Sequence, residues 1–429
     1  MKKMSSVNCW RTLVASIAIM ISMSTSSLYA AVYTNANVAA DLTNTTRWVG
    51  GVVPTWNVNS PILVWDNTLQ NPSACTNATG GGNIQFSGLV IRDPIADVYI
   101  TNTATYFGFT SRPSLGIDMS SAQKNLAFAG NIYFEFQNST GTISIATGKT
   151  VQFSSIIQRG STINITNQGM VAYKTWDVGH YNGNGAYLNV MAGTVTNVGS
   201  VVMKIGSGGN NYNGVVYQTG GTFHPYSMTV VGQAAISSYT LSGGAVFLRG
   251  DLQVCTSVLT GSVNVVGGTL NQSGGAFIVG NGAGIAYYTQ SGGSVTIYTN
   301  SIASGTGIGM FTISNGTFSA TVFGQLASGA GATGTIVLAG GTTTLPAFPT
   351  NRGVNASAIV TFDGGTLSPR ASTNGYLRGL TAAYVTTNGA VLDTAGYDIT
   401  ISQKLEDFSG HAGRLVKKGA GTLTLSGTN

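Results

Sequence analysis

Charge is scarce in this sequence. Only 7% of its 429 residues are Asp, Glu, Lys or Arg, against about 25% in ordinary globular proteins. Lys and Arg are scattered singly, apart from Lys417 and Lys418, whereas a nucleic-acid-binding protein carries a basic stripe. Disorder is also excluded, because 43% of the residues are hydrophobic. We therefore expect a folded protein with no nucleic-acid partner.

Cysteine and metal-binding patterns are equally sparse. The three cysteines are Cys9, Cys75 and Cys255, and the last two lie too far apart in a repetitive fold for the short Cα separation that a disulfide needs. The three histidines share no metal-ligand spacing. The calcium-binding pattern Gly-Gly-x-Gly-x-Asp is absent. The sequence predicts no disulfide, no metal and no cofactor.

The first thirty residues have the three parts of a secretory signal peptide. Met1–Arg11 is basic and has no acid, Leu13–Met23 is apolar, and Ser24–Ala30 is rich in small polar residues. The apolar run is shorter than the roughly 20 residues that span a bilayer. We predict that residues 1–30 are removed and that the protein is secreted or held at the cell surface.

After residue 30 the sequence has no convincing helical periodicity and is built on a recurring phrase. Tyr288–Val295 reads Tyr-Thr-Gln-Ser-Gly-Gly-Ser-Val. Similar phrases place the second glycine of the pair, in steps of 23 to 25 residues, at Gly221, Gly244, Gly268, Gly293, Gly316, Gly341 and Gly365. Such a period indicates a repeat architecture. Three strands of about five residues plus three turns fill one period, which predicts an all-β, single-stranded, right-handed parallel β-helix with coils of about 24 residues.

The positions around the glycine pair indicate a core and a corner. The residues four and two before the first glycine are mostly apolar and share one face of a strand. Gln218 and Gln290 interrupt this row, and we expect them to point inward and hydrogen-bond along the rod. The glycines themselves should turn the chain with positive φ, which Gly adopts without steric cost. A phosphate-binding role is disfavoured because no helix follows them.

The repeat divides the chain. Residues 31–130 fit the period poorly and contain three of the five tryptophans, so we expect an N-terminal cap and irregular first coils. Residues 131–412 form the regular coils. One longer step, from Gly193 to Gly221, indicates an extra loop at Gly206–Gly214. Residues 413–429 begin a further repeat.

Leu415–Asn429 reads Leu-Val-Lys-Lys-Gly-Ala-Gly-Thr-Leu-Thr-Leu-Ser-Gly-Thr-Asn. This resembles the autotransporter-associated β-strand repeat, Leu-x-Lys-x-Gly-x-Gly-Thr-Leu-x-Leu-x-Gly-x-Asn, as far as its first half. Arg47–Pro54 is similar to the Trp-x-Gly-Gly-x-x-Pro opening of such secreted bacterial proteins. The resemblance implies a passenger-like surface or secreted β-helix, and the repeat brings no catalytic residue. The repeat pattern would continue beyond residue 429, which makes 413–429 a truncated copy.

These observations predict a non-enzymatic structural or adhesive surface element. The alternative is a carbohydrate-binding or polysaccharide-degrading β-helix, which would need acids at matching positions of neighbouring coils. Asp363 and Asp393 do not match in this way, and Asp177 with His180 has no nearby nucleophile in the sequence.

We expect an unknown surface ligand as the partner, with polysaccharide or the surface of a host or neighbouring cell as candidates. Outward aromatic residues could stack on sugar rings, and the candidates are Tyr212, Tyr226, Tyr287 and Tyr298. A third possibility is self-association through an uncapped C-terminal end, whose unpaired strand edges could template another chain.

Overall fold

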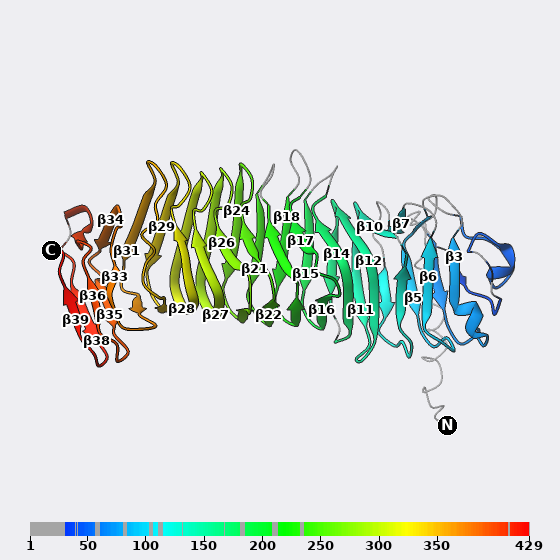
Figure 1. The fold of residues 1–429 in the computed structure, drawn as a ribbon. Coiled ribbons are helices and arrows are strands. Elements are labelled where there is room, and N and C mark those ends of the chain that lie inside the picture. The colour runs from blue at the N-terminus through cyan, green and yellow to red at the C-terminus, as the bar shows by residue number, and fades with distance from the viewer. Residues whose placement is uncertain are drawn as a thin grey trace, which may run out of the picture.

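A computed structural model describes residues 31–428, except 39, 41, 56–60, 80–83, 103–105, 110–114, 131, 167, 181–184, 208–212, 232–235 and 411. The predicted signal peptide, residues 1–30, and Tyr212 lie outside the described residues. The described chain is 55% strand and forms a β-solenoid of about 14 turns with a spacing of about 24 residues. Figure 1 shows an elongated rod with β3 near one end and β38 and β39 at the other. The predicted β-helix is confirmed.

Each coil adds a strand to as many as three parallel stacks. Stack A pairs the strands that precede the glycine corners. Its members are β1 (Val32–Thr34), β2 (Ile62–Trp65), β5 (Gly88–Ile91), β8 (Gly116–Met119), β11 (Thr140–Ile145), β13 (Thr162–Ile165), β15 (Ala186–Val190), β18 (Gly214–Gln218), β21 (Ser237–Leu241), β24 (Thr260–Val265), β27 (Ile285–Ile302), β28 (Ile308–Leu326), β29 (Thr333–Leu338), β31 (Ser357–Phe362), β34 (Ala382–Val385) and β37 (Glu406–Asp407).

Stack B follows the corners. It contains β3 (Thr76–Thr79), β6 (Val98–Asn102), β9 (Leu126–Ala129), β12 (Thr150–Arg159), β14 (Met170–Val178), β16 (Thr194–Asn197), β19 (Thr222–His224), β22 (Ala245–Leu248), β25 (Thr269–Gln272), parts of β27 and β28, β30 (Thr342–Thr344), β32 (Thr366–Ser368), β35 (Ala390–Asp393) and β38 (Leu415–Lys418).

Stack C completes the coil. It contains β4 (Ile84–Phe86), β7 (Tyr106–Phe109), β10 (Tyr133–Gln137), the second halves of β12 and β14, β17 (Val202–Ile205), β20 (Ser227–Val230), β23 (Leu252–Val254), β26 (Ala276–Val279) and the ends of β27 and β28. At the C-terminal end a separate three-stranded sheet comprises β33 (Thr373–Leu377), β36 (Ile399–Ile401) and β39 (Leu423–Leu425).

Helical structure is minor in the described part of the chain. Three 3₁₀ turns occur, at η1 (Thr45–Arg47), η2 (Pro72–Cys75) and η3 (Phe408–Gly410). A membrane-crossing helix, with the length and apolar character this requires, is not found among the described residues.

The core lies inside the three stacks, where like side chains meet from coil to coil. Val263, Tyr288 and Phe311 occupy matching register positions and are at most 1% exposed. The rings of Tyr288 and Phe311 stack with centroids 4.6 Å apart. Alternate residues point inward because successive side chains of a strand lie on opposite faces. The core row predicted four positions before the first glycine is therefore confirmed.

The two inward glutamines bond along the rod, as predicted. Gln218 Nε2 donates to the carbonyl of Ala245 at 3.0 Å, and its Oε1 accepts from the Tyr239 hydroxyl at 2.6 Å. Gln290 Nε2 donates to the carbonyl of Thr317 at 2.9 Å, and its Oε1 accepts from the Tyr288 hydroxyl at 2.8 Å. Each amide thus supplies a hydrogen-bond partner to a tyrosine that is buried in an otherwise apolar core.

Gln290→Leu should lower the free energy of unfolding by about 1–3 kcal/mol, because the Tyr288 hydroxyl and the Thr317 carbonyl lose a buried partner. Adding Tyr288→Phe should recover more than half of that loss, since Phe311 and Ile313 already form the apolar equivalent in the next coil. Urea unfolding of the single and double variants measures both values. Additive losses would contradict the proposed pairing.

The glycine corners differ in one respect from the prediction that both members of a pair turn the chain with positive φ. The second glycine has φ between +63° and +83° at Gly221, Gly244, Gly268, Gly293, Gly316 and Gly341. The first glycine of these pairs does not; at Gly292 an added Cβ would instead meet the Val266 carbonyl oxygen at 2.2 Å.

The prediction of positive φ is wrong at Gly365. At that corner Gly364 carries the positive φ, +97°, and Gly365 does not. The reason is the direction of the amide: the Gly364 N–H donates to Gly389 of the following coil, whereas Gly243 N–H donates to Gln218 of the preceding coil.

The region predicted to cap the N-terminal end already contributes strands to the solenoid, beginning with the parallel pair β1–β2. Arg47 is fully buried, and burial lowers its pKa to about 10. Its Nη1 and Nη2 donate to the carbonyls of Val38 and Ala74. Trp48 packs edge-on against Trp65, with centroids 6.5 Å apart. One cation thereby ties together two loops of the first coils.

Both described cysteines are buried as thiols, as small core side chains. Burial raises the pKa of the Cys75 and Cys255 thiols, which keeps them protonated. Within the predicted repeat segment, β38 pairs in parallel with β35, and β39 pairs in parallel with β36.

Candidate functional site

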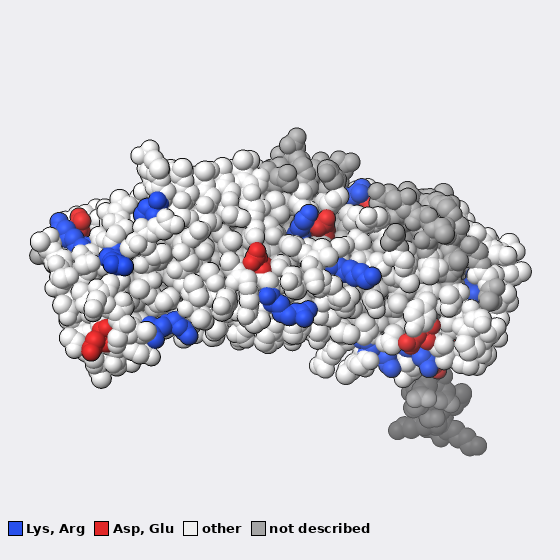
Figure 2. Space-filling view, viewed as in Figure 1, with Lys and Arg blue, Asp and Glu red and all other residues white. Residues whose placement is uncertain are grey.

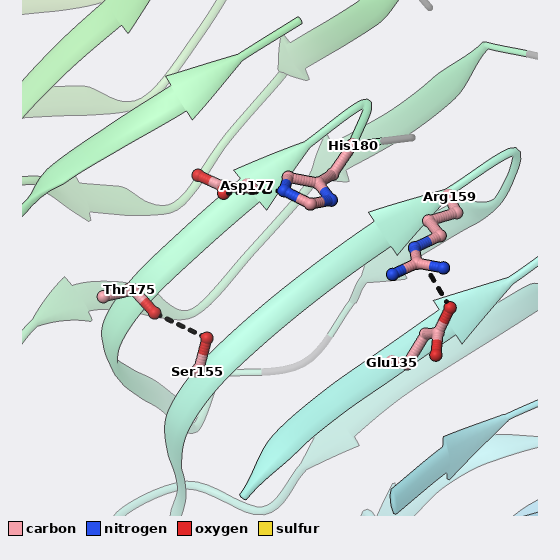
Figure 3. A network of polar contacts seen from close by, with 6 residues as sticks. All are labelled: Glu135, Ser155, Arg159, Thr175, Asp177 and His180. Carbon is pink, nitrogen blue, oxygen red and sulfur yellow. Dashed lines mark hydrogen bonds and ion pairs between the residues drawn. The ribbon is translucent and has the colours of Figure 1, made fainter. Parts of the chain in front are cut away.

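A cluster of polar and charged side chains lies on the outer face of stack C, where β10, β12, β14 and β17 run side by side (Figure 3). The register aligns Glu135 with Ile157, Ile157 with Asp177, and Asp177 with Lys204. Charged residues are only 7% of the chain. In a chain with so few charges, several charged side chains on adjacent strands make this face a candidate site.

Three contacts connect the cluster (Figure 3). Arg159 Nε lies 3.2 Å from Glu135 Oε1. The Thr175 hydroxyl donates to Ser155 Oγ at 2.7 Å. His180 Nε2 lies 3.8 Å from Asp177 Oδ2. The contacts cross between strands of neighbouring coils or join a strand to its following turn, so the coil stacking itself sets their geometry.

Burial dominates the electrostatics of the cluster. It raises the pKa of the Glu135 carboxyl, and the Arg159 guanidinium offsets part of that rise. It also raises the pKa of Asp177, with Lys204 acting in the opposite direction. The pKa of His180 is lowered by burial and further by Arg159 and Lys204, so the imidazole is neutral at pH 7.

An open groove of about 950 Å³ runs over these strands; we call it the stack C groove. It is lined by Gly130, Ile132, Tyr133, Ser154, Ser155, Ile157, Arg159, Lys174, Thr175, Asp177, His180, Val201, Val202 and Lys204. Of the charged residues that line it, Lys174 and Lys204 are exposed, whereas Asp177 and Arg159 are half-buried. Glu135, the half-buried partner of Arg159, is not part of the lining. The groove therefore presents mainly cations to solvent.

A second, smaller groove lies on stack B. It has a volume of about 580 Å³, and its lining includes His224, Phe247 and Arg249. The rings of His224 and Phe247 stack at 5.0 Å with an angle of 15°. This groove offers an aromatic floor and one arginine, with no acid in its lining.

The tyrosines predicted to bind a partner are not brought together by the described structure, and none lines the stack C groove. Tyr226 is half-buried, with the guanidinium carbon of Arg249 5.9 Å from its ring centre. Tyr287 and Tyr298, both on β27, are 36% and 48% exposed. Tyr212 lies outside the described residues. The aromatic side chain at the stack C groove is Tyr133, which sequence reasoning missed.

The sequence search also missed the pairing of Glu135 with Arg159. It assumed coils of about 24 residues, but the aligned positions Glu135, Ile157, Asp177 and Lys204 are separated by 22, 20 and 27 residues. The two acids are thus two coils apart, with Ile157 between them. Among the described residues, no group of three or more His, Cys, Asp and Glu side chains could hold a metal ion.

The site can bind and orient a ligand by charge and hydrogen bonding. Its hydroxyl pair, exposed lysines and exposed Tyr133 offer complementary groups to a polar ligand with apolar patches. No protein family, curated protein or solved structure matches this chain.

Proposed function

We propose that this protein is an exported, non-enzymatic β-solenoid that serves as a structural or adhesive element at the cell surface. The observation that carries the proposal is the continuous stacking of about 14 coils into one rod. Each coil of such a repeat contacts only its neighbours, which gives a stiff element with long repeated faces. The signal-like residues 1–30 and the repeat-like segment Leu415–Asn429 support export to a bacterial surface.

The mechanism of such an element is geometric. Parallel hydrogen bonds between coils hold the rod, and its outer faces and loops meet the partner. Figure 2 shows that one face carries few charged side chains, several of them with a basic group beside an acidic one. Hydroxyl and amide side chains supply most of the polar groups on such a surface. It is therefore suited to contacts based on shape and hydrogen bonding.

Export is tested with the full chain, carrying a C-terminal epitope, in a bacterial host. The expected product starts near residue 31 by N-terminal sequencing and is found in the medium or is accessible to protease on intact cells. Ile19→Arg interrupts the apolar run and should retain the uncleaved chain in the cell, while Ile19→Leu should leave export unchanged. An uncleaved cytoplasmic wild-type chain would contradict the proposal.

The alternative of a carbohydrate-active β-helix is favoured by one feature, the stack C groove. The placement of the acids supports binding over cleavage, since Glu135 and Asp177 are on non-adjacent coils and each faces a basic side chain. The purified protein should release no new reducing ends from a panel of neutral and acidic polysaccharides. Sustained release of reducing ends would replace the non-enzymatic proposal.

A further inference from the structure

We propose that the stack C groove binds an acidic polysaccharide, a linear polymer of uronic acids, with Lys174, Lys204 and Arg159 contacting its carboxylates. The inference rests on the export proposed above, because such polymers are met outside the cell. It assigns a ligand class and a binding face to the rod.

Charge complementarity is the first argument. Lys174 and Lys204 are exposed at the groove, on β14 and β17. Basic groups near the two acids weaken the repulsion between those acids and an incoming anion. Glu135 is paired with Arg159, and Asp177 lies beside His180 and aligns with Lys204. Burial also raises the pKa of both carboxyls, which eases their protonation beside an anion.

The remaining lining fits a sugar rather than a small inorganic anion. The Ser155 and Thr175 hydroxyls form one pair across adjacent coils, 2.7 Å apart, and can exchange hydrogen bonds with sugar hydroxyls. Tyr133 and Val201, 43% and 44% exposed, supply apolar surface for the C–H face of a pyranose ring. An inorganic anion would use the cations and leave these surfaces empty.

The shape of the groove indicates a polymer. The groove crosses the parallel strands β10, β12, β14 and β17, whose coils follow one another at about 4.8 Å along the rod. It is an open trough of about 950 Å³. An extended chain can therefore lie along the rod axis and place successive sugars over successive coils.

The test measures binding of the intact mature protein to oligogalacturonate by isothermal titration calorimetry. We expect saturable binding that weakens as salt rises from low to physiological strength. Methyl-esterified oligogalacturonate, which has the same backbone without the charges, should bind at least about tenfold more weakly, since it lacks the ionic contacts with the three cations.

Variants locate the site. Lys174→Ala with Lys204→Ala should weaken oligogalacturonate binding about tenfold, from two exposed charge contacts. Lys404→Ala is the matched control, because it removes an exposed lysine that does not line the groove and should change affinity less than twofold. Circular dichroism and the melting midpoint should be unchanged in both variants, since the lysines are on the surface.

Four results would overturn the inference. In the first, the exported and folded wild-type protein does not bind oligogalacturonate; this result would leave the proposed structural role unaffected. Another is equal binding of the esterified polymer, and a third is equal loss in the Lys404 control. Tighter, Lys174- and Lys204-dependent binding of oligothymidylate would assign the groove to another polyanion and would equally overturn the uronic-acid assignment.

Discussion

Gly293→Ala should lower the free energy of unfolding by about 2–5 kcal/mol, more than a glycine-to-alanine change on a surface turn. Two effects add. Gly293 has a φ of +67°, which costs an L-residue about 1–2 kcal/mol. The new Cβ would also lie 2.6 Å from the Gly268 carbonyl oxygen and 2.8 Å from the Gly267 carbonyl carbon. Those atoms belong to the backbone of the preceding coil, and forcing them apart costs about 1–3 kcal/mol more.

The chain offers a control that separates the two effects. Gly331 has a φ of +68°, almost the same as Gly293, but an added Cβ there would meet nothing within 4 Å. Gly331→Ala should therefore cost only the conformational term, about 1–2 kcal/mol. Chemical unfolding of both variants gives the comparison. Equal losses would show that contact between stacked glycines does not govern the corner, and the steric account would be abandoned.

The same contact explains why glycine recurs at the corner. A Cβ on Gly244 would meet the Gly221 carbonyl oxygen at 2.3 Å, and a Cβ on Gly316 would meet that of Gly293 at 2.4 Å. Each glycine thus leaves room for the one on the next coil. The sequence pattern indicated a turn with positive φ, which accounts for only part of the requirement.

The fold was predictable because it follows from a local pattern repeated many times. The period placed the strands, and the core row at Val263, Tyr288 and Phe311 followed from alternation within each strand. Gly365 departs from the pattern because its neighbour Gly364 directs its N–H to the following coil. The residues around that corner give no sequence signal that the hydrogen bond runs to the following coil.

The candidate site was less predictable because it lies where coil length varies. Matching Glu135 to Asp177 requires counting a 22-residue coil and then a 20-residue coil, and a fixed period of 24 misplaces both. Side-chain exposure could not be read from the sequence either: none of the described tyrosines chosen from the sequence lines the stack C groove, whereas Tyr133 shares it with Lys174 and Lys204. In a repeat protein, ligand sites of this kind depend on the irregular coils.

Deleting Ala245–Gly316 should give a folded protein that is shorter by about 14 Å, three coil spacings. The cut removes three whole coils, since Ala245, Thr269, Ser294 and Thr317 occupy one register position. Gly244 then precedes Thr317, as Gly316 does in the intact chain. Because each coil contacts only its neighbours, the remaining rod should unfold cooperatively, with a denaturant dependence lower by roughly 20%.

The matched control removes residues 245–304, which is about two and a half coils. It joins Gly244, at a corner after stack A, to Gly305, shortly before the next strand of stack A. The deletion removes two stack A strands but three stack B and three stack C strands, so one remaining stack A strand would have no stack B and stack C strands after it, and the core rows could not close. We expect aggregation or loss of soluble protein. Small-angle scattering and circular dichroism compare the two deletions; equal folding of both would mean that coil register does not hold the rod, while failure of both would mean that the coils are not independent repeating units.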